Sequence, residues 1–136
     1  MFLKNIELTN FRNFKNIKFD FDNLNIFSGP NGRGKTNILE AIYLLSSTKS
    51  FRSSKNRDLV LWGEEFNRIE ANIKNSQKTK LEFIIDLRPE AHQPKIVKID
   101  EKKRKLFFIL GKLKTVLFSP ESLNIILGSP QTRRRF

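Results

Sequence analysis

The sequence predicts an α/β fold, in which a glycine-rich turn between a strand and a helix is joined to an antiparallel β-subdomain. The first observation is the order at residues 24–45: a short apolar run, a turn rich in glycine, and then apolar residues at helical spacing. The second is the alternation of apolar and polar residues in several other segments, which is typical of half-buried strands in antiparallel sheets.

The N-terminal segments 2–8 (FLKNIEL) and 16–22 (NIKFDFD) both alternate in this way. They are joined by TNFRNFKN, so we expect an antiparallel pair. Each strand should place its apolar residues on one face: Phe2, Ile6 and Leu8 in the first, and Ile17, Phe19 and Phe21 in the second.

The next segment reads as a strand over Leu24–Phe27 that ends in the turn Ser28-Gly29. A helix is expected from Thr36, because apolar residues recur at i, i+1, i+4 and i+7. Those residues are Ile38, Leu39, Ile42 and Leu45, and Asn37 and Glu40 fall off that face.

The rest of the chain continues with short elements. Strands are expected at Arg68–Lys74, Lys80–Leu87 and Lys95–Asp100, with NSQK as a hairpin loop between the first two. Polar loops are expected at residues 46–56 and 88–94, a short helix at Arg57–Trp62, and a charged turn at 100–105. Leu106–Leu110 is short and ambiguous. A strand-like run follows at Thr115–Phe118, and helices are expected to start at Ser119 and Ser129. A chain ending on an opening helix is expected to be the N-terminal part of a longer protein.

Composition excludes several classes of protein. The chain has 136 residues, enough for one domain at most, and no cysteine, so it carries no disulfide framework or thiolate zinc site. No apolar run reaches the length of a membrane span, and the N-terminus does not read as a signal peptide, so a cytoplasmic protein with no membrane partner is expected. The net charge of +12 favours a polyanionic partner such as nucleic acid.

The glycine-rich turn carries a specific motif. Gly29, Gly34, Lys35 and Thr36 satisfy G-x-x-x-x-G-K-[ST], in which backbone N–H groups and the helix N-terminus surround phosphate oxygens. Lys35 is expected to reach the β- and γ-phosphates of a nucleotide, and the Thr36 hydroxyl is expected to bind Mg²⁺. We predict that the loop and the start of the helix bind the nucleotide through Gly29, Pro30, Asn31, Gly32, Arg33, Gly34, Lys35, Thr36 and Asn37.

Four segments together resemble the RecF family of bacterial recombination and repair ATPases. They are LTNFRNF, GPNGRGKTNILEAIYLLS, KSFRSSKNRDL and VLFSPESLNIILGSPQTRRRF. The first two are also similar to segments of related chromosome-maintenance and break-repair ATPases, whereas the last is more particular to RecF.

The resemblance implies a P-loop NTPase core with an antiparallel β-subdomain, the first lobe of an ABC-type ATPase head related to SMC and Rad50 heads. It implies ATP and Mg²⁺ as cofactors, and DNA and RecO- and RecR-type proteins as partners. The full-length protein is expected to form an ATP-dependent homodimer and to hydrolyse ATP slowly. The Walker B carboxylates and the signature segment of the second lobe are expected beyond residue 136, so residues 1–136 are interpreted as an ATP-binding lobe that lacks catalytic residues.

Other charged residues admit two interpretations. By the same resemblance Arg12 and Asn13 lie near the nucleotide phosphates, or else they belong to a plain hairpin loop. Arg52, with Lys49, Lys55 and Arg57, either faces DNA or the nucleotide or lies in a solvated loop. Lys102–Lys105 reads as a solvent-facing turn. The three consecutive arginines 133–135, at a helix start, favour an anionic partner or acidic residues of the second lobe.

Several residues are expected to have no chemical role. Asp86 ends an apolar run, but Leu87 stands where a water-activating glutamate would follow, so a surface strand is favoured over a Mg²⁺ ligand. Trp62 and Tyr43 are expected to pack, and His92 is expected to be exposed. Two other functions stay open: a different P-loop NTPase such as a small-substrate kinase, which would need a substrate lid, and a non-enzymatic DNA-binding module.

Overall fold

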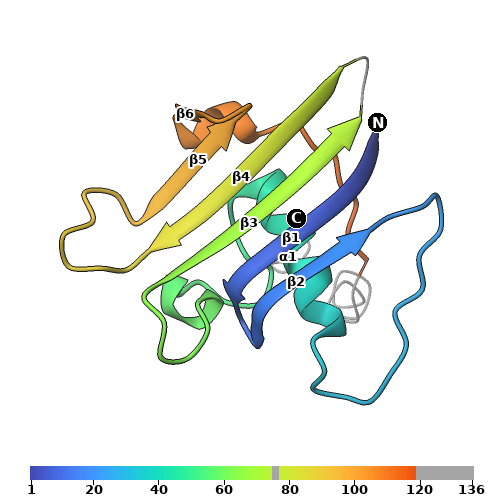
Figure 1. Ribbon diagram of the computed structural model, residues 1–136, viewed down its shortest axis with the longest axis horizontal. Coiled ribbons are helices and arrows are strands. Elements are labelled where there is room, and N and C mark those ends of the chain that lie inside the picture. The colour runs from blue at the N-terminus through green and yellow to red at the C-terminus, as the bar shows by residue number, and fades with distance from the viewer. Residues whose placement is uncertain (75–76, 119–136) are drawn as a thin grey trace, which may run out of the picture.

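The structure is a computed structural model that describes residues 1–74 and 77–118 (Figure 1). The alternating residues among the first twenty form the β1–β2 hairpin. β1 (Phe2–Phe11) pairs with β2 (Phe14–Asp20), and both strands run closer to the turn than the sequence predicts. The expectation for Phe2 is wrong: a register shift between Leu3 and Asn5 turns Leu3 toward the core and leaves Phe2 56% exposed. The other predicted face residues of both strands pack on the core as expected.

The β1–β2 hairpin forms one side of a six-stranded antiparallel sheet in the order β2-β1-β3-β4-β5-β6. The further strands are β3 (Phe66–Lys74), β4 (Lys78–Asp86), β5 (Lys95–Ile99) and β6 (Lys102–Arg104). The predicted antiparallel β-subdomain is therefore confirmed. The predicted charged turn is not: Asp100 and Glu101 alone make the turn, and the three residues that follow pair with β5 as the edge strand.

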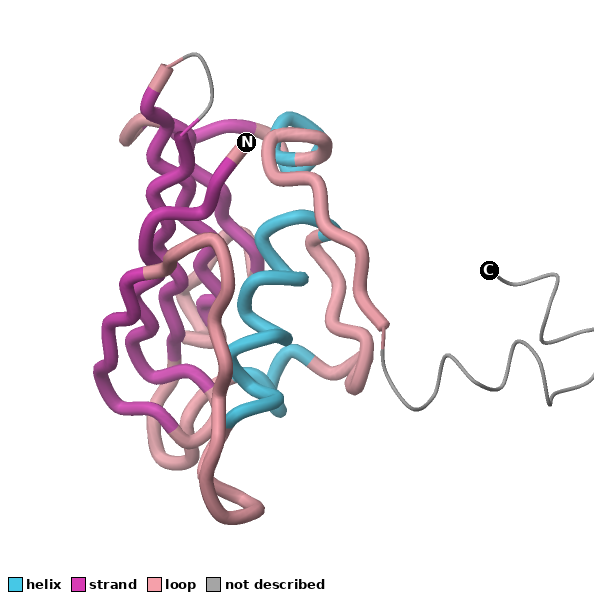
Figure 2. The backbone as a smooth tube through the Cα atoms, turned by 90° about the vertical axis from the view of Figure 1, so that its right-hand side faces the viewer, coloured by secondary structure: helices cyan, strands magenta, loops and turns pink. Residues whose placement is uncertain are grey.

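One helix, α1 (Lys35–Ser47), packs on a single face of this sheet (Figure 2). Apolar residues from β1, β3, β4 and β5 point toward it, because alternate strand residues share a face. The largest buried side chains include Phe11, Phe83, Ile6, Leu44 and Ile69.

The predicted apolar stripe of α1 is only partly right. Ile38 and Leu45 are buried, but Leu39 is 43% exposed and Glu40 is fully buried. The Glu40 carboxylate can be buried because it is paired with charged side chains, which are described below.

The segment Leu24–Phe27 is not a strand in the described part of the chain, which corrects the expectation. Its backbone pairs with none of the six strands, and Leu24 and Ile26 are 79% and 83% exposed. A strand needs a partner for its backbone N–H and C=O groups, and apolar composition alone does not supply one.

The remaining segments differ in smaller ways. Two 3-10 turns occur at Asn56–Leu59 and Leu106–Ile109, so the predicted helix over 57–62 is shorter and earlier; Val60 forms a β-bridge with Phe11. Thr115–Phe118 is not a strand within the described residues. The expectations for Ser119, Ser129 and Arg133–Arg135 lie outside them. No described helix is long and apolar enough to cross a membrane.

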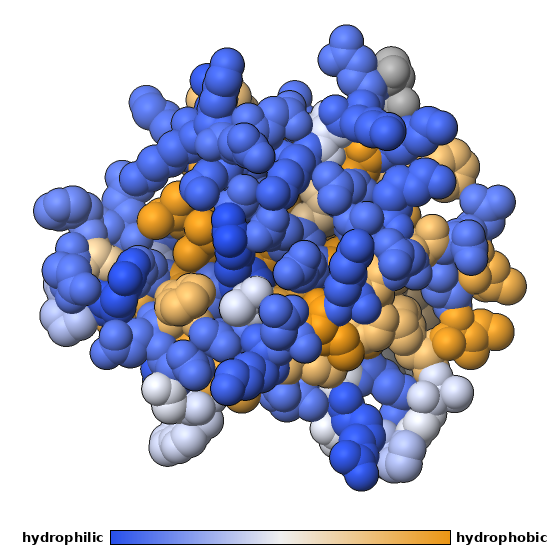
Figure 3. All heavy atoms as spheres, in the orientation of Figure 1, coloured by the Kyte–Doolittle hydropathy of each residue, from blue (hydrophilic) through white to orange (hydrophobic). Residues whose placement is uncertain are grey.

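The face of the sheet turned away from α1 is mainly hydrophilic (Figure 3). At its centre Glu82 is almost fully buried. Glu82 Oε2 forms ion pairs with Arg68 Nη2 at 3.0 Å and with Lys98 Nζ at 3.2 Å. Burial raises the pKa of Glu82, but hydrogen bonds from Arg68 and Lys98 outweigh burial, so the pKa lies below its ordinary value. Cations at the centre of the sheet are thus balanced by carboxylates.

We expect acid to weaken this network. A carboxylate whose pKa is lowered by folding stabilises the protein above its unfolded-state pKa, near 4.5, and loses that contribution as the pH falls through the folded-state value. Urea unfolding monitored by circular dichroism should therefore show stability falling below about pH 4.5. Glu82→Gln should be less stable at pH 7 and show a flatter fall.

The exposed Glu101 supplies the control for this experiment. Glu101→Gln should keep the slope of the parent protein. An unchanged slope in Glu82→Gln would show that Glu82 is not responsible.

Candidate phosphate-binding site

The glycine-rich loop turns directly into the first turn of α1. Gly29, Gly32 and Gly34 have φ values of 140°, 80° and 100°, which favour glycine. Gly34 is the N-cap of α1, where no side chain caps the helix and the first turn has no acidic residue. The positive end of the helix is therefore left free for an anion.

Lys35 places its ammonium group over this loop. Its Nζ donates to the carbonyl oxygens of Gly29 at 2.7 Å and of Pro30 at 2.9 Å. These bonds hold the charge beside the loop N–H groups, where phosphate oxygens are strong acceptors for an ammonium.

The β1–β2 turn packs against the same helix start. Asn37 Nδ2 donates to Asn13 Oδ1 at 2.8 Å. A Cβ atom built on Gly34 would lie 2.9 Å from Asn13 Oδ1 and within 3.0 Å of the Phe14 ring. The fold thus brings Arg12 and Asn13 to the loop, as the resemblance implies, although their contact with a nucleotide stays a prediction.

A buried carboxylate ties three segments together behind the loop. Arg12 Nε and Nη2 donate to the two oxygens of Glu40 at 2.8 and 2.6 Å, a bidentate pair. Ser50 Oγ donates to Glu40 Oε1 at 2.5 Å, and Arg52 Nη1 lies 3.6 Å from Oε2. Arg52 Nη1 also donates to Asn37 Oδ1 at 2.7 Å. Sequence reasoning missed Glu40, because nothing local marks a carboxylate whose partners are 10 or more residues away.

A hollow of about 430 Å³ adjoins the loop. Arg12, Asn13 and Asn37 line one part of it, and Arg57 and Trp62 line another. Trp62 is 91% exposed, so the expectation that it packs in the core is wrong, and the Arg57 guanidinium lies 6.0 Å from its ring centroid. Tyr43 does pack, edge-to-face on Phe51.

The other predicted site residues lie where a ligand could reach them. Thr36 and loop residues 30–33 are exposed. Asp86 ends the antiparallel strand β4 and is held by Arg88, which lowers its pKa. In residues 1–74 and 77–118 no three His, Cys, Asp or Glu side chains cluster as metal ligands. The role of the Thr36 hydroxyl toward Mg²⁺ stays a prediction.

Comparison with known proteins places this geometry in a family. The AAA ATPase domain profile matches residues 1–124. The chain belongs to the AAA ATPase domain family. Proteins with similar sequences include the DNA replication and repair protein RecF of Lactobacillus gasseri, 42% identical over the whole chain, and that of Bacillus velezensis, 38% identical. These confirm the resemblance to RecF, and the chain spans 36% of the length of each.

Solved structures support the same resemblance to RecF. The recombination mediator protein RecF-ATP in the RecFOR pathway matches 98% of this chain and 36% of its own, with a TM-score of 0.86 and 39% identity. The SMC head domain from Thermotoga maritima covers 96% of this chain and 52% of its own, with a TM-score of 0.64 and 19% identity, which supports the fold alone. The predicted fold class, an ABC-type ATPase head, is thereby confirmed.

Proposed function

We propose that this chain is the ATP-binding first lobe of a RecF-like DNA replication and repair protein. The observation that carries the proposal is the loop of Gly29–Thr36 at the uncapped N-terminus of α1, with the Lys35 ammonium over it. That a similar solved structure is of RecF-ATP supports ATP as the ligand.

In this proposal each group has a part in binding. Backbone N–H groups of residues 31–35 hold the phosphates, Lys35 neutralises the β- and γ-phosphates, and Thr36 with the phosphates holds Mg²⁺. Glu40 holds Arg12 and Arg52 in place behind the loop. Asn13 and Asn37 fix the turn beside it.

The hollow lined by Arg57, Asp58 and Trp62 also reaches Asn13 and Asn37 beside the start of α1, and we assign it to the remainder of the nucleotide. An exposed indole ring can stack on a base, and a neighbouring guanidinium can pair with phosphate.

We further propose that ATP hydrolysis needs a second lobe of the head. Water activation and a carboxylate ligand for Mg²⁺ are required for phosphoryl transfer, and in this proposal the second lobe supplies both. The whole protein would dimerise around ATP, act on DNA gaps in the cytoplasm and work with RecO- and RecR-type proteins. The net charge of +12 supports a DNA partner.

Replacing Lys35 tests the proposal. Lys35→Ala removes an ammonium that would make two or more charge-assisted bonds to phosphate, each worth about 1.5–3 kcal/mol. ATP–Mg²⁺ titration calorimetry should therefore show affinity lower by at least about a hundredfold. The exposed Lys15→Ala, which makes the same charge change on β2, should bind as the parent protein does. Equal affinity in Lys35→Ala would refute the phosphate role of the loop.

A further inference from the structure

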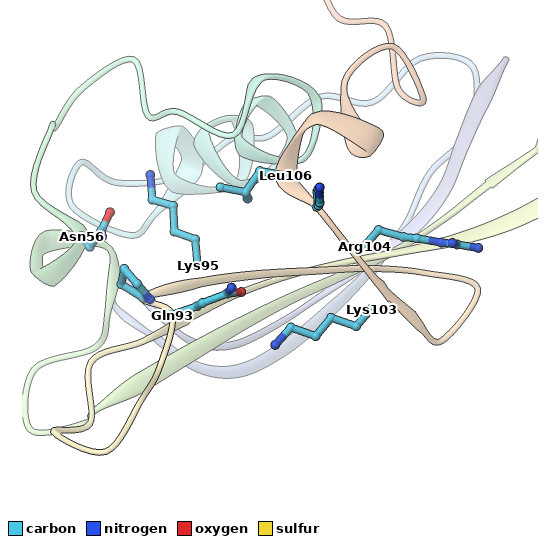
Figure 4. Close-up of a pocket in the computed structure, with 8 residues that line it drawn as sticks. Asn56, Gln93, Lys95, Lys103, Arg104 and Leu106 are labelled. Atoms are coloured by element: carbon cyan, nitrogen blue, oxygen red, sulfur yellow. The ribbon is translucent and has the colours of Figure 1, made fainter.

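A basic groove runs beside the β5–β6 edge of the sheet, on the side of the loop that follows α1. Two adjoining hollows of about 580 and 470 Å³ form it, and both are lined by Asn56 and Lys95. Figure 4 shows Lys95 rising toward the loop that carries Asn56, with Lys103 and Arg104 on β6 beyond it. The groove is lined by six cations: Lys49, Arg52, Lys95, Lys103, Arg104 and Lys105.

Among residues 1–74 and 77–118, no carboxylate lines either hollow. In the part of the chain that the structure describes, Lys49, Lys95, Lys103, Arg104 and Lys105 form no ion pair, and only Arg52 has a carboxylate partner, Glu40. The contrast with the centre of the sheet is sharp, because Arg68, Lys80 and Lys98 there are all paired with glutamates. The positive charge that lines this groove is thus largely unbalanced by carboxylates.

Protection of the sheet edge does not account for the whole groove. Lysines on an edge strand discourage pairing with another chain, and this explains basic residues on β6. It does not explain Lys49 and Arg52, which come from the loop after α1, nor Lys95, whose Nζ lies 3.3 Å from the Thr48 carbonyl oxygen. Cations from three separate segments line the two adjoining hollows.

We propose that this groove binds the phosphodiester backbone of DNA. The cations are spread along two adjoining hollows, which fits a run of phosphates better than one phosphate group. Lysine and arginine in a groove bind DNA through its backbone, independently of base sequence. The proposal rests on the proposed DNA-related function and adds where the strand lies on this lobe.

The test compares two double variants with equal charge. Lys103→Gln/Lys105→Gln removes two groove cations, and Lys15→Gln/Lys18→Gln removes two exposed cations from β2, the opposite edge of the sheet. Fluorescence anisotropy with a labelled single strand and a labelled duplex, each at several salt concentrations, measures the affinity. Unfolding midpoints and ATP affinity check that both variants are intact.

Loss of two phosphate contacts should lower the slope of log K against log salt by about 1.8 for duplex or 1.4 for single-stranded DNA. If parent and variant bind alike at 1 M salt, a tenfold dilution to 0.1 M makes the variant bind duplex about 60-fold and single strand about 25-fold more weakly than the parent. The groove holds the DNA form whose salt slope changes by the value expected for that form. The β2 variant should lose much less.

Three results would overturn the proposal that this groove binds DNA. If the parent protein binds DNA but both variants bind equally well or equally poorly, only the groove assignment fails. If the parent protein binds neither DNA form while ATP binding persists, the DNA part of the proposed function fails with it. If the groove variant loses affinity only for anionic phosphatidylglycerol vesicles, the groove is a lipid site.

Discussion

Glu40→Gln is expected to destabilise the protein by about 3–5 kcal/mol, the usual cost of removing one partner from a buried ion pair. The Glu40 side chain is fully buried and the Arg12 side chain is 17% exposed, so water cannot replace the lost charge. The amide also places donors against the Arg12 guanidinium, which has only donors to offer. Urea unfolding at pH 7 measures the change.

Two further variants isolate the cause. Arg52 is 43% exposed and 3.6 Å from Glu40, so Arg52→Ala should cost less than about 1 kcal/mol. Replacing both buried partners, in Arg12→Met/Glu40→Leu, should recover much of the stability lost in Glu40→Gln, because no unpaired charge is left inside. A Glu40→Gln protein within about 1 kcal/mol of the parent would contradict the buried-pair account.

The same carboxylate also orients the site. It joins the β1–β2 turn through Arg12, the loop after α1 through Ser50 and Arg52, and α1 itself. Removing its charge should therefore lower ATP affinity as well as stability, although Glu40 does not lie in the loop.

The sequence predicts the elements whose signal is local. Alternation in residues 68–74 and 80–87 predicts the β3–β4 hairpin, and the spacing of glycines before Lys35 predicts the turn that leads into α1. Both depend on backbone periodicity or on conformations that only glycine adopts easily. Strand ends shift by a few residues, because the turn geometry at Arg12 and Asn13 decides where pairing begins.

The failures come from contacts distant in the chain. Glu40 lies off the apolar stripe, yet Arg12 and Ser50 make its burial favourable, and Leu39 is turned outward instead. Leu24–Phe27 is apolar but has no ladder partner among the described strands. Trp62 is large and apolar, as core residues often are, but it is exposed and lines the hollow next to Asn13 and Asn37. A pattern in one segment cannot specify which other segment will meet it.

Gly34→Ala is expected to destabilise the protein by about 2–5 kcal/mol. The left-handed backbone at φ 100° costs a non-glycine residue about 1–2 kcal/mol, and overpacking adds about 1–3 kcal/mol. The overpacking arises because the new Cβ would lie within 3.0 Å of the Phe14 ring and 2.9 Å from Asn13 Oδ1. Relief of this contact would move the turn away from the helix start, so ATP affinity should fall too. Urea unfolding and calorimetric titration measure the two effects.

Gly32→Ala is the matched control, because Gly32 also has a positive φ, 80°, but nothing lies within 4 Å of its added Cβ. It should cost only the backbone part, about 1–2 kcal/mol. A double-mutant cycle with Phe14→Leu then separates the ring contact: shortening the side chain should recover about 1 kcal/mol or more of the Gly34→Ala loss. If Gly34→Ala costs no more than Gly32→Ala and shows no coupling to Phe14, the close approach of the turn to the helix start does not hold the loop in place.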